Sequence, residues 1–106
     1  MDTVTLAIIA AAEIGATYGE PVVGERVTVD AYGFLKEVIR RKFADDVALL
    51  EAIDAFEADP TSAVRRQALR DAVVATGAHQ DATVLQAAQA LLDKIEDQPG
   101  GEQFIP

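Results

Sequence analysis

The stretch Thr3-Val-Thr-Leu-Ala-Ile-Ile-Ala-Ala-Ala-Glu-Ile-Gly-Ala-Thr-Tyr18 decides how the rest of this sequence folds. It contains a single charged residue, Glu13, and no proline, so it predicts a helix over residues 3–18. Its large apolar residues spread over most of the helical circumference: Leu6, Ile8, Ile9 and Ile14. A helix that is apolar nearly all round is either buried inside a bundle or destined for lipid.

The remainder of the chain has the pattern of amphipathic helices, apolar on one side and charged on the other. Helices are predicted over about residues 29–43, 45–58, 60–76 and 81–97, after a loop or short extended piece over residues 20–29. The residues expected to cap or end these helices are Asp45 or Asp46, Asp59 with Pro60, Gly77 and Asp81. We therefore predict an all-α bundle of four to five helices over residues 1–97, followed by a linker-like tail over residues 98–106.

The composition excludes several classes of protein. With 106 residues the chain forms one domain, and the absence of cysteine rules out disulfides and thiolate metal sites. A net charge of -9 and a lack of tryptophan argue against a nucleic-acid partner. We predict no nucleic-acid binding.

The sequence also lacks the residue sets that catalysis requires. Its one histidine, His79, is expected in a loop, and no spaced set of His and Cys residues accompanies it. None of the glycine-rich or serine motifs of phosphate-binding or hydrolytic enzymes is present. We predict a non-enzymatic protein with no metal and no cofactor.

The N-terminal helix does not have the features of a targeting segment. No basic residue precedes the apolar run, as a secretory signal would require. A helix over residues 3–18 would be about 24 Å long, shorter than the ~30 Å hydrocarbon core of a bilayer. We expect a soluble, cytoplasmic protein in the resting state.

Charged residues occur in blocks. The basic run Arg40, Arg41 and Lys42 ends the helix over 29–43, the helix over 45–58 is acidic, and arginines open the helix over 60–76. Because short connections make consecutive helices antiparallel neighbours, we expect these blocks to meet with opposite sign. The basic run is interpreted either as a solvated helix end that complements the helix dipole, which we favour, or as a contact for anionic lipid headgroups.

A set of short segments from Tyr32 to Gln103 carries a resemblance to a known family. They are Phe34-Leu-Lys with Arg41-Lys-Phe43, Glu57-Ala-Asp-Pro-Thr-Ser62, Gln67-Ala-Leu-Arg70, Thr76-Gly-Ala-His-Gln-Asp81, Leu85-Gln-Ala-Ala-Gln-Ala-Leu-Leu92 and Gln98-Pro-Gly-Gly-Glu-Gln103. In this order, after a hydrophobic start, they resemble the bacterial Bell domain, a counterpart of fungal HeLo-like domains and of the four-helix bundle of the necroptosis pseudokinase. The chain departs from the family at its end, Phe104-Ile-Pro106, where an Asn/Gly-rich amyloid motif commonly follows.

The resemblance implies a cell-death effector of bacterial immunity. Such a bundle stays inactive until an NLR-type receptor templates an amyloid motif, and clustering then frees the N-terminal helix to enter the inner face of the plasma membrane. Leu6, Ile8, Ile9 and Ile14 would insert, and Glu13 would restrain the insertion. The alternative is an adaptor of death-fold type, which acts through homotypic helix contacts and has no membrane activity. From the residues alone, a helix that is apolar all round is most often the central helix of a soluble bundle.

Overall fold

The computed structural model describes residues 2–18 and 26–97 of the chain. These residues form five α-helices, one 3-10 turn and no strand, which confirms the predicted all-α fold. The elements are α1 (Thr3–Tyr18), α2 (Arg26–Lys42), α3 (Val47–Ala58), α4 (Ala63–Thr76), η1 (Ala78–Gln80) and α5 (Ala82–Glu96). The predicted tail over 98–106 lies outside the described residues, as does most of the predicted loop, whose residues 26–29 belong to α2.

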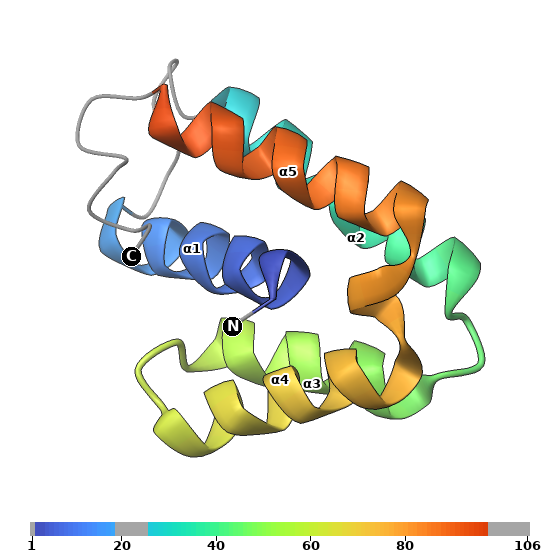
Figure 1. Cartoon of the computed structure of the whole chain (residues 1–106). Helices are drawn as coiled ribbons and strands as arrows, with labels where there is room; N and C mark the ends of the chain where they lie inside the picture. Colours follow the sequence, from blue (N-terminus) through green and yellow to red (C-terminus); the bar gives the residue numbers. More distant parts are fainter. Residues whose placement is uncertain (1, 19–25, 98–106) are drawn as a thin grey trace.

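The helix α1 lies between two pairs of helices (Figure 1). One pair is α2 with α5 and the other is α3 with α4, and α1 contacts members of both pairs. This arrangement follows from the sequence, because each amphipathic helix has one apolar face to bury and α1 is apolar on several sides. The central position predicted for a helix of this composition is therefore the one observed.

A single cluster of buried apolar side chains joins all five helices. Its largest fully buried members are Ile8 of α1, Leu35 and Ile39 of α2, Leu49 and Phe56 of α3, Leu69 of α4, and Leu91 and Ile95 of α5. Burial of this cluster is the main free-energy term that holds the bundle together.

Two helix ends agree with the sequence prediction. Gly77 ends α4 with φ of 78°, a left-handed conformation that a glycine adopts without steric cost. Asp81 caps α5, because its carboxylate Oδ1 accepts hydrogen bonds from the backbone N–H groups of Thr83 and Val84, each at 3.0 Å.

Two other helix ends differ from the prediction. Asp59 and Pro60 do not begin α4; they lie in a turn in which the Ser62 N–H donates to the Asp59 carbonyl at 3.2 Å. Proline is favourable at the second position of such a turn. The Thr61 hydroxyl donates a hydrogen bond to the Asp59 carboxylate at 2.6 Å. Ser62 caps α4 instead, accepting from the Arg65 N–H. Asp46 precedes α3 as predicted, but its side chain makes no capping hydrogen bond.

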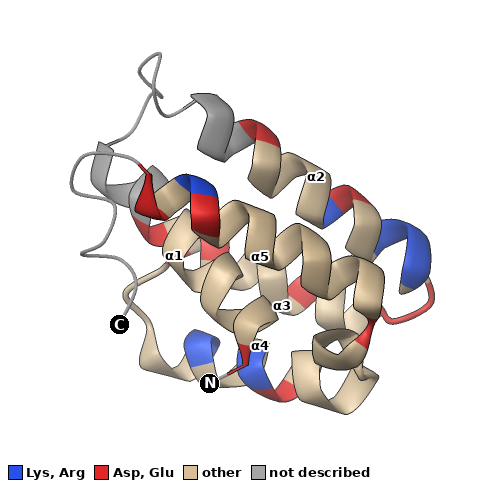
Figure 2. Cartoon of the chain, turned by 45° about the horizontal axis from the view of Figure 1, so that its top comes forward, with Lys and Arg blue, Asp and Glu red and all other residues tan. Residues whose placement is uncertain are grey.

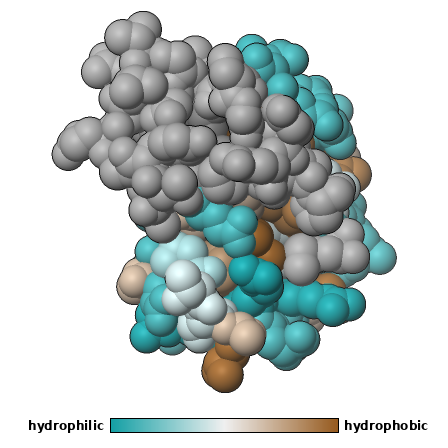
Figure 3. All heavy atoms as spheres, turned by 90° about the vertical axis from the view of Figure 1, so that its left-hand side faces the viewer, coloured by the Kyte–Doolittle hydropathy of each residue, from teal (hydrophilic) through white to brown (hydrophobic). Residues whose placement is uncertain are grey.

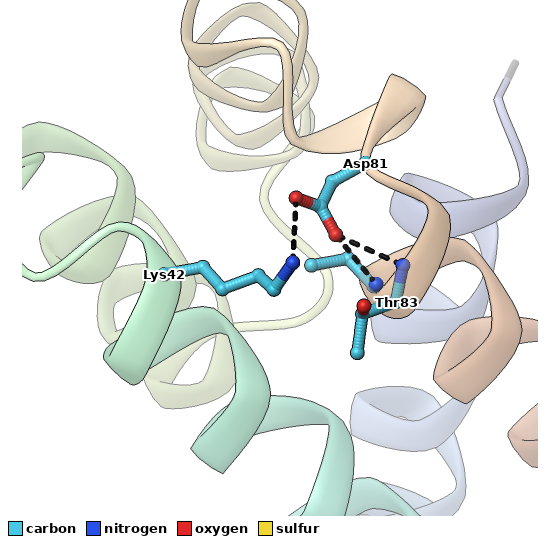
Figure 4. Close-up of polar contacts among 4 residues, drawn as sticks. Lys42, Asp81 and Thr83 are labelled. Atoms are coloured by element: carbon cyan, nitrogen blue, oxygen red, sulfur yellow. Dashed lines mark hydrogen bonds and ion pairs between the residues drawn. The ribbon is translucent and has the colours of Figure 1, made fainter.

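Helices that follow one another in the sequence are not always neighbours in the bundle. The helix α2 packs most closely on α5, whereas α3 packs on α4. The ammonium group of Lys42, at the end of α2, lies 3.2 Å from the carboxylate of Asp81, at the start of α5 (Figure 4). The reason is that α1 occupies the centre, so each outer helix pairs with the neighbour on its own side of α1.

Candidate functional site

The candidate site is the helix α1 together with the groups that hold it. Of the predicted insertion residues, Ile8 is fully buried, Ile9 is 6 % exposed and Leu6 is half-buried against the core. The side chain of Ile14 lies outside the described residues. Close contact along residues 4–12 is possible because this part of the helix is rich in alanine, whose small side chain lets neighbouring helices approach.

The first turn of α1 is closed by polar contacts. One carboxylate oxygen of Asp2 accepts from the Thr5 N–H and the other from the Thr5 hydroxyl, both at 2.8 Å. Thr5 is fully buried, so this contact satisfies a hydroxyl that would otherwise be buried without a partner. The start of α1 is thereby fixed without any charge inside its apolar part.

Glu13 follows directly after the buried residues 7–12 of α1. Its carboxylate Oε1 lies 2.9 Å from Nη2 of Arg66 in α4, and the two residues are 53 positions apart in sequence. Both side chains are partly exposed, at 31 % for Glu13 and 43 % for Arg66. The Nε atom of Arg66 is buried and has no hydrogen-bond partner in the described structure. The charge that the sequence places in α1 is thus neutralised by a specific arginine.

The basic run at the end of α2 is largely paired within the molecule. Arg41 bonds Glu37 one turn earlier at 3.3 Å, and Lys42 bonds Asp81. The Val84 N–H and the Lys42 ammonium hold the pKa of the Asp81 carboxyl below its usual range. Figure 2 shows these basic residues gathered at the end of α2, with a second group near the start of α4. A lipid headgroup would have to compete with the carboxylates that Arg41 and Lys42 already contact.

A second polar cluster connects α2 with α3. The Lys36 ammonium lies 3.0 Å from both carboxylate oxygens of Glu57 and 5.3 Å from the centre of the Tyr32 ring. Burial raises the pKa of Tyr32 far above its usual range, and the nearby Glu57 carboxylate raises it further. The Tyr32 hydroxyl is buried and has no hydrogen-bond partner among the described residues. This is not the predicted meeting of charge blocks, because Lys36 lies outside the basic run of residues 40–42, whose Arg41 and Lys42 pair with Glu37 and Asp81 instead.

The described residues offer little that could bind a small molecule. No group of three or more His, Asp or Glu side chains among residues 2–18 and 26–97 could hold a metal ion. A cavity between α2 and α3 has a volume of about 30 Å³, room for little more than a water molecule. A larger groove of about 410 Å³ is lined by residues of α4 alone, and therefore is the outer face of one helix. His79 lies in η1, and its buried Nδ1 has no hydrogen-bond partner in this part of the chain.

The outer surface carries isolated apolar side chains. The exposed large ones are distributed over four helices: Phe34, Val47, Val64, Val74 and Leu85. On the described part of the face drawn in Figure 3, hydrophilic residues predominate and hydrophobic atoms show in small separate places. Across the two described ranges no helix combines the length and the apolar character that crossing a membrane demands.

Comparison with known families adds one result. A family model described as the Het-E N-terminal domain, HetE-N, matches residues 1–106. The chain belongs to this family. The HetE-N family is associated with HeLo-like cell-death domains, which confirms the broader part of the predicted resemblance. The match does not single out the bacterial Bell domain. No curated protein and no solved structure gives a significant match.

Sequence reasoning missed one residue of this HetE-N domain, Arg66. The sequence singled out Glu13 as the one charge of α1, and it showed Arg65 and Arg66 side by side at the start of α4. Arg65 instead donates to the Ala55 carbonyl near the end of α3 at 2.8 Å. Which arginine meets Glu13 depends on the rotation of α4 about its axis, and only the packed structure defines it.

Proposed function

We propose that this HetE-N domain is a non-enzymatic, membrane-targeting effector of cell death or immunity. It rests in the cytoplasm as the bundle described above and inserts α1 into the inner face of the plasma membrane when several copies cluster. The finer assignment is to the Bell-type domains, in which an NLR-type receptor triggers clustering through an amyloid signalling motif outside this sequence. Membrane lipids and further copies of the domain are its partners, and nucleic acid is not.

The observation that carries this proposal is the composition and placement of α1. Most soluble bundles bury one face of each helix, yet here residues 4, 5 and 7–12 are all buried. A helix with so little polar surface has a low cost of transfer to lipid, because the main cost would come from Glu13. Leu6, Ile8, Ile9 and Ile14 would supply the apolar contact with the acyl chains.

The length of α1 explains why clustering is needed. With 16 residues α1 is about 24 Å long, shorter than the ~30 Å hydrocarbon core. A segment that is too short is accommodated by thinning of the bilayer or by association with further copies. Clustering raises the local concentration of such segments, and it therefore favours the inserted state over the resting state.

The test is leakage of a dye from vesicles with anionic or neutral lipids, using the chain fused to a module that oligomerises on addition of a small molecule. Deleting residues 1–12 would remove the centre of the core, so loss of leakage in that variant alone is ambiguous. A better variant carries one cysteine in α1 and one in α5, chosen with Cα atoms about 5.5 Å apart. The chain has no other cysteine, so the disulfide can be closed and reopened in the same molecule.

The reduced and oxidised forms of that variant serve as matched controls. We expect leakage on clustering with the disulfide open, and its loss with the disulfide closed, because α1 is then tied to α5. Equal leakage by both forms would show that α1 does not leave the bundle. No leakage by any form after clustering would favour the death-fold adaptor, which needs contacts between copies and no lipid.

A further inference from the structure

The contact between Glu13 and Arg66 differs from the other ion pairs of the described residues in what it joins. The pairs of Lys36 with Glu57 and of Lys42 with Asp81 connect outer helices to one another, whereas the pair at Glu13 connects α1 to α4. Toward the N-terminus of Glu13, α1 is held by apolar contacts and by its Asp2 cap.

Because the ion pair of Glu13 with Arg66 is partly buried, loss of the charge on Glu13 also affects the arginine that remains. If Glu13 loses its charge, the guanidinium of Arg66 keeps a buried Nε with no acceptor and loses the carboxylate that compensates it. Removing one partner of a partly buried pair costs more than the net strength of the pair, since the other charge is left desolvated. Because both side chains are partly exposed, we expect the effect of losing the Glu13 charge to lie toward the upper end of the range for surface ion pairs.

We propose that the ion pair between Glu13 and Arg66 is a clasp that holds α1 in the resting bundle. The ion pair must open before α1 can separate from α4, so its strength sets how often α1 is released. The role of the clasp in activation rests on the proposed function, in which α1 leaves the bundle. The same charge opposes entry into lipid, so Glu13 restrains activation at both steps.

The test measures the release of α1 in solution, where no membrane is needed. Ala10 in α1 and Ala88 in α5 are both fully buried, and the chain has no native cysteine. Single variants Ala10→Cys and Ala88→Cys therefore report opening of α1 and opening of α5 through their rates of reaction with a maleimide. Each is combined with Glu13→Gln, which removes the charge and keeps the size of the side chain.

We expect Glu13→Gln to raise the labelling rate at position 10 by about two- to fivefold and to raise the rate at position 88 by less. The matched control is Glu57→Gln, which breaks an ion pair that does not involve α1 and whose glutamate is exposed to a similar extent, 27 % against 31 % for Glu13. This control should change the two labelling rates by the same factor, because it weakens the bundle as a whole.

Equal acceleration at positions 10 and 88 by Glu13→Gln, or none at either, would overturn the clasp. If a cysteine variant does not fold, hydrogen exchange of the amides in α1 and α5 of the otherwise native chain gives the same comparison. Selective loosening of α1 supports the clasp whether or not vesicles leak, whereas leakage tests the proposed function. The two proposals can therefore fail separately.

Discussion

Two core substitutions that lower the free energy of unfolding by similar amounts should differ in their effect on membrane insertion if the proposed function holds. Ile8 in α1 and Leu69 in α4 are both fully buried, and replacing either by alanine removes three carbon atoms. At about 0.8 kcal/mol per buried carbon the transfer loss is about 2.4 kcal/mol, and the cavity left behind brings the total to about 3–5 kcal/mol. Each variant should therefore lose a comparable part of the free energy of unfolding.

The two variants differ in the inserted state. Leu69→Ala weakens the resting bundle by about 3–5 kcal/mol and leaves α1 unchanged, so the ratio of inserted to resting molecules should rise on the order of 10²- to 10³-fold. Ile8→Ala weakens the bundle by a similar amount and also removes apolar contact between α1 and lipid, by about the same transfer term of 2.4 kcal/mol. For Ile8→Ala the two transfer terms cancel and only the cavity term of about 0.6–2.6 kcal/mol remains, so its leakage should rise far less than that of Leu69→Ala.

The assay pairs urea unfolding, followed by circular dichroism, with dye leakage after induced clustering. Unfolding curves with unchanged slopes and equal midpoints would establish that the two variants are equally destabilised. We expect much faster leakage for Leu69→Ala than for Ile8→Ala, although both variants are destabilised to a similar extent. Equal acceleration by both variants would refute the reasoning, because leakage would then follow from general exposure of the core and not from α1.

Three further predictions concern stability. Gly77→Ala should lower the free energy of unfolding in urea by about 1–2 kcal/mol, because residues other than glycine are strained in the left-handed conformation of this position. A clash does not contribute, since a Cβ here would have no atom within 4 Å. Gly77→Asn should cost less, because asparagine adopts this conformation more readily than alanine. Asp81→Ala should lower the melting temperature at pH 7, and the difference should shrink as the pH falls below 3.8, the ordinary pKa of an Asp, since an Asp with a lowered pKa stabilises the fold only while it is ionised. Tyr32→Phe should leave the free energy of unfolding at pH 7 unchanged or raised, because it removes a buried hydroxyl without a partner among the described residues. It should also lessen the fall in the free energy of unfolding between about pH 9 and pH 11, because a raised phenol pKa stabilises the fold only while the unfolded phenol stays protonated.

Each of these three predictions has a result that would contradict it. An alanine at position 77 without cost would mean that the turn relaxes to another conformation. A constant effect of Asp81→Ala down to pH 2 would mean that neither the cap nor the Lys42 contact depends on the charge. A large loss on Tyr32→Phe at pH 7 would mean that the hydroxyl has a bonded partner in solution.

The features predicted correctly from the sequence are those that depend on neighbouring residues. The apolar spacing of each helix, the left-handed glycine at 77 and the carboxylate of Asp81 two and three residues before its donors are all local. The burial of α1 was also predictable, because a helix without a polar face has no favourable orientation at the surface of a bundle.

The features predicted wrongly depend on competition between residues. Asp59-Pro60 has the composition of a helix start, but Thr61 and Ser62 follow it and offer better partners for the turn and the cap. The pairing of α2 with α5 was missed because short connections suggest that α2 should lie beside α3. A central helix removes that preference, since it separates the outer helices into two layers.

The same central helix connects the fold to the proposed activity. The core helix α1 has five alanines among its 16 residues, which allow close approach of its neighbours, but each alanine buries little apolar area by itself. The free energy that keeps α1 in place is therefore divided among Ile8, Ile9, several alanines and one ion pair, with no single large anchor. Under the proposed function, clustering of several copies would supply the bias that releases such a helix from the resting bundle. Glu13 follows the buried residues 7–12 and its carboxylate lies 2.9 Å from Arg66, so the adjustable contribution to this balance would rest on one pair of side chains.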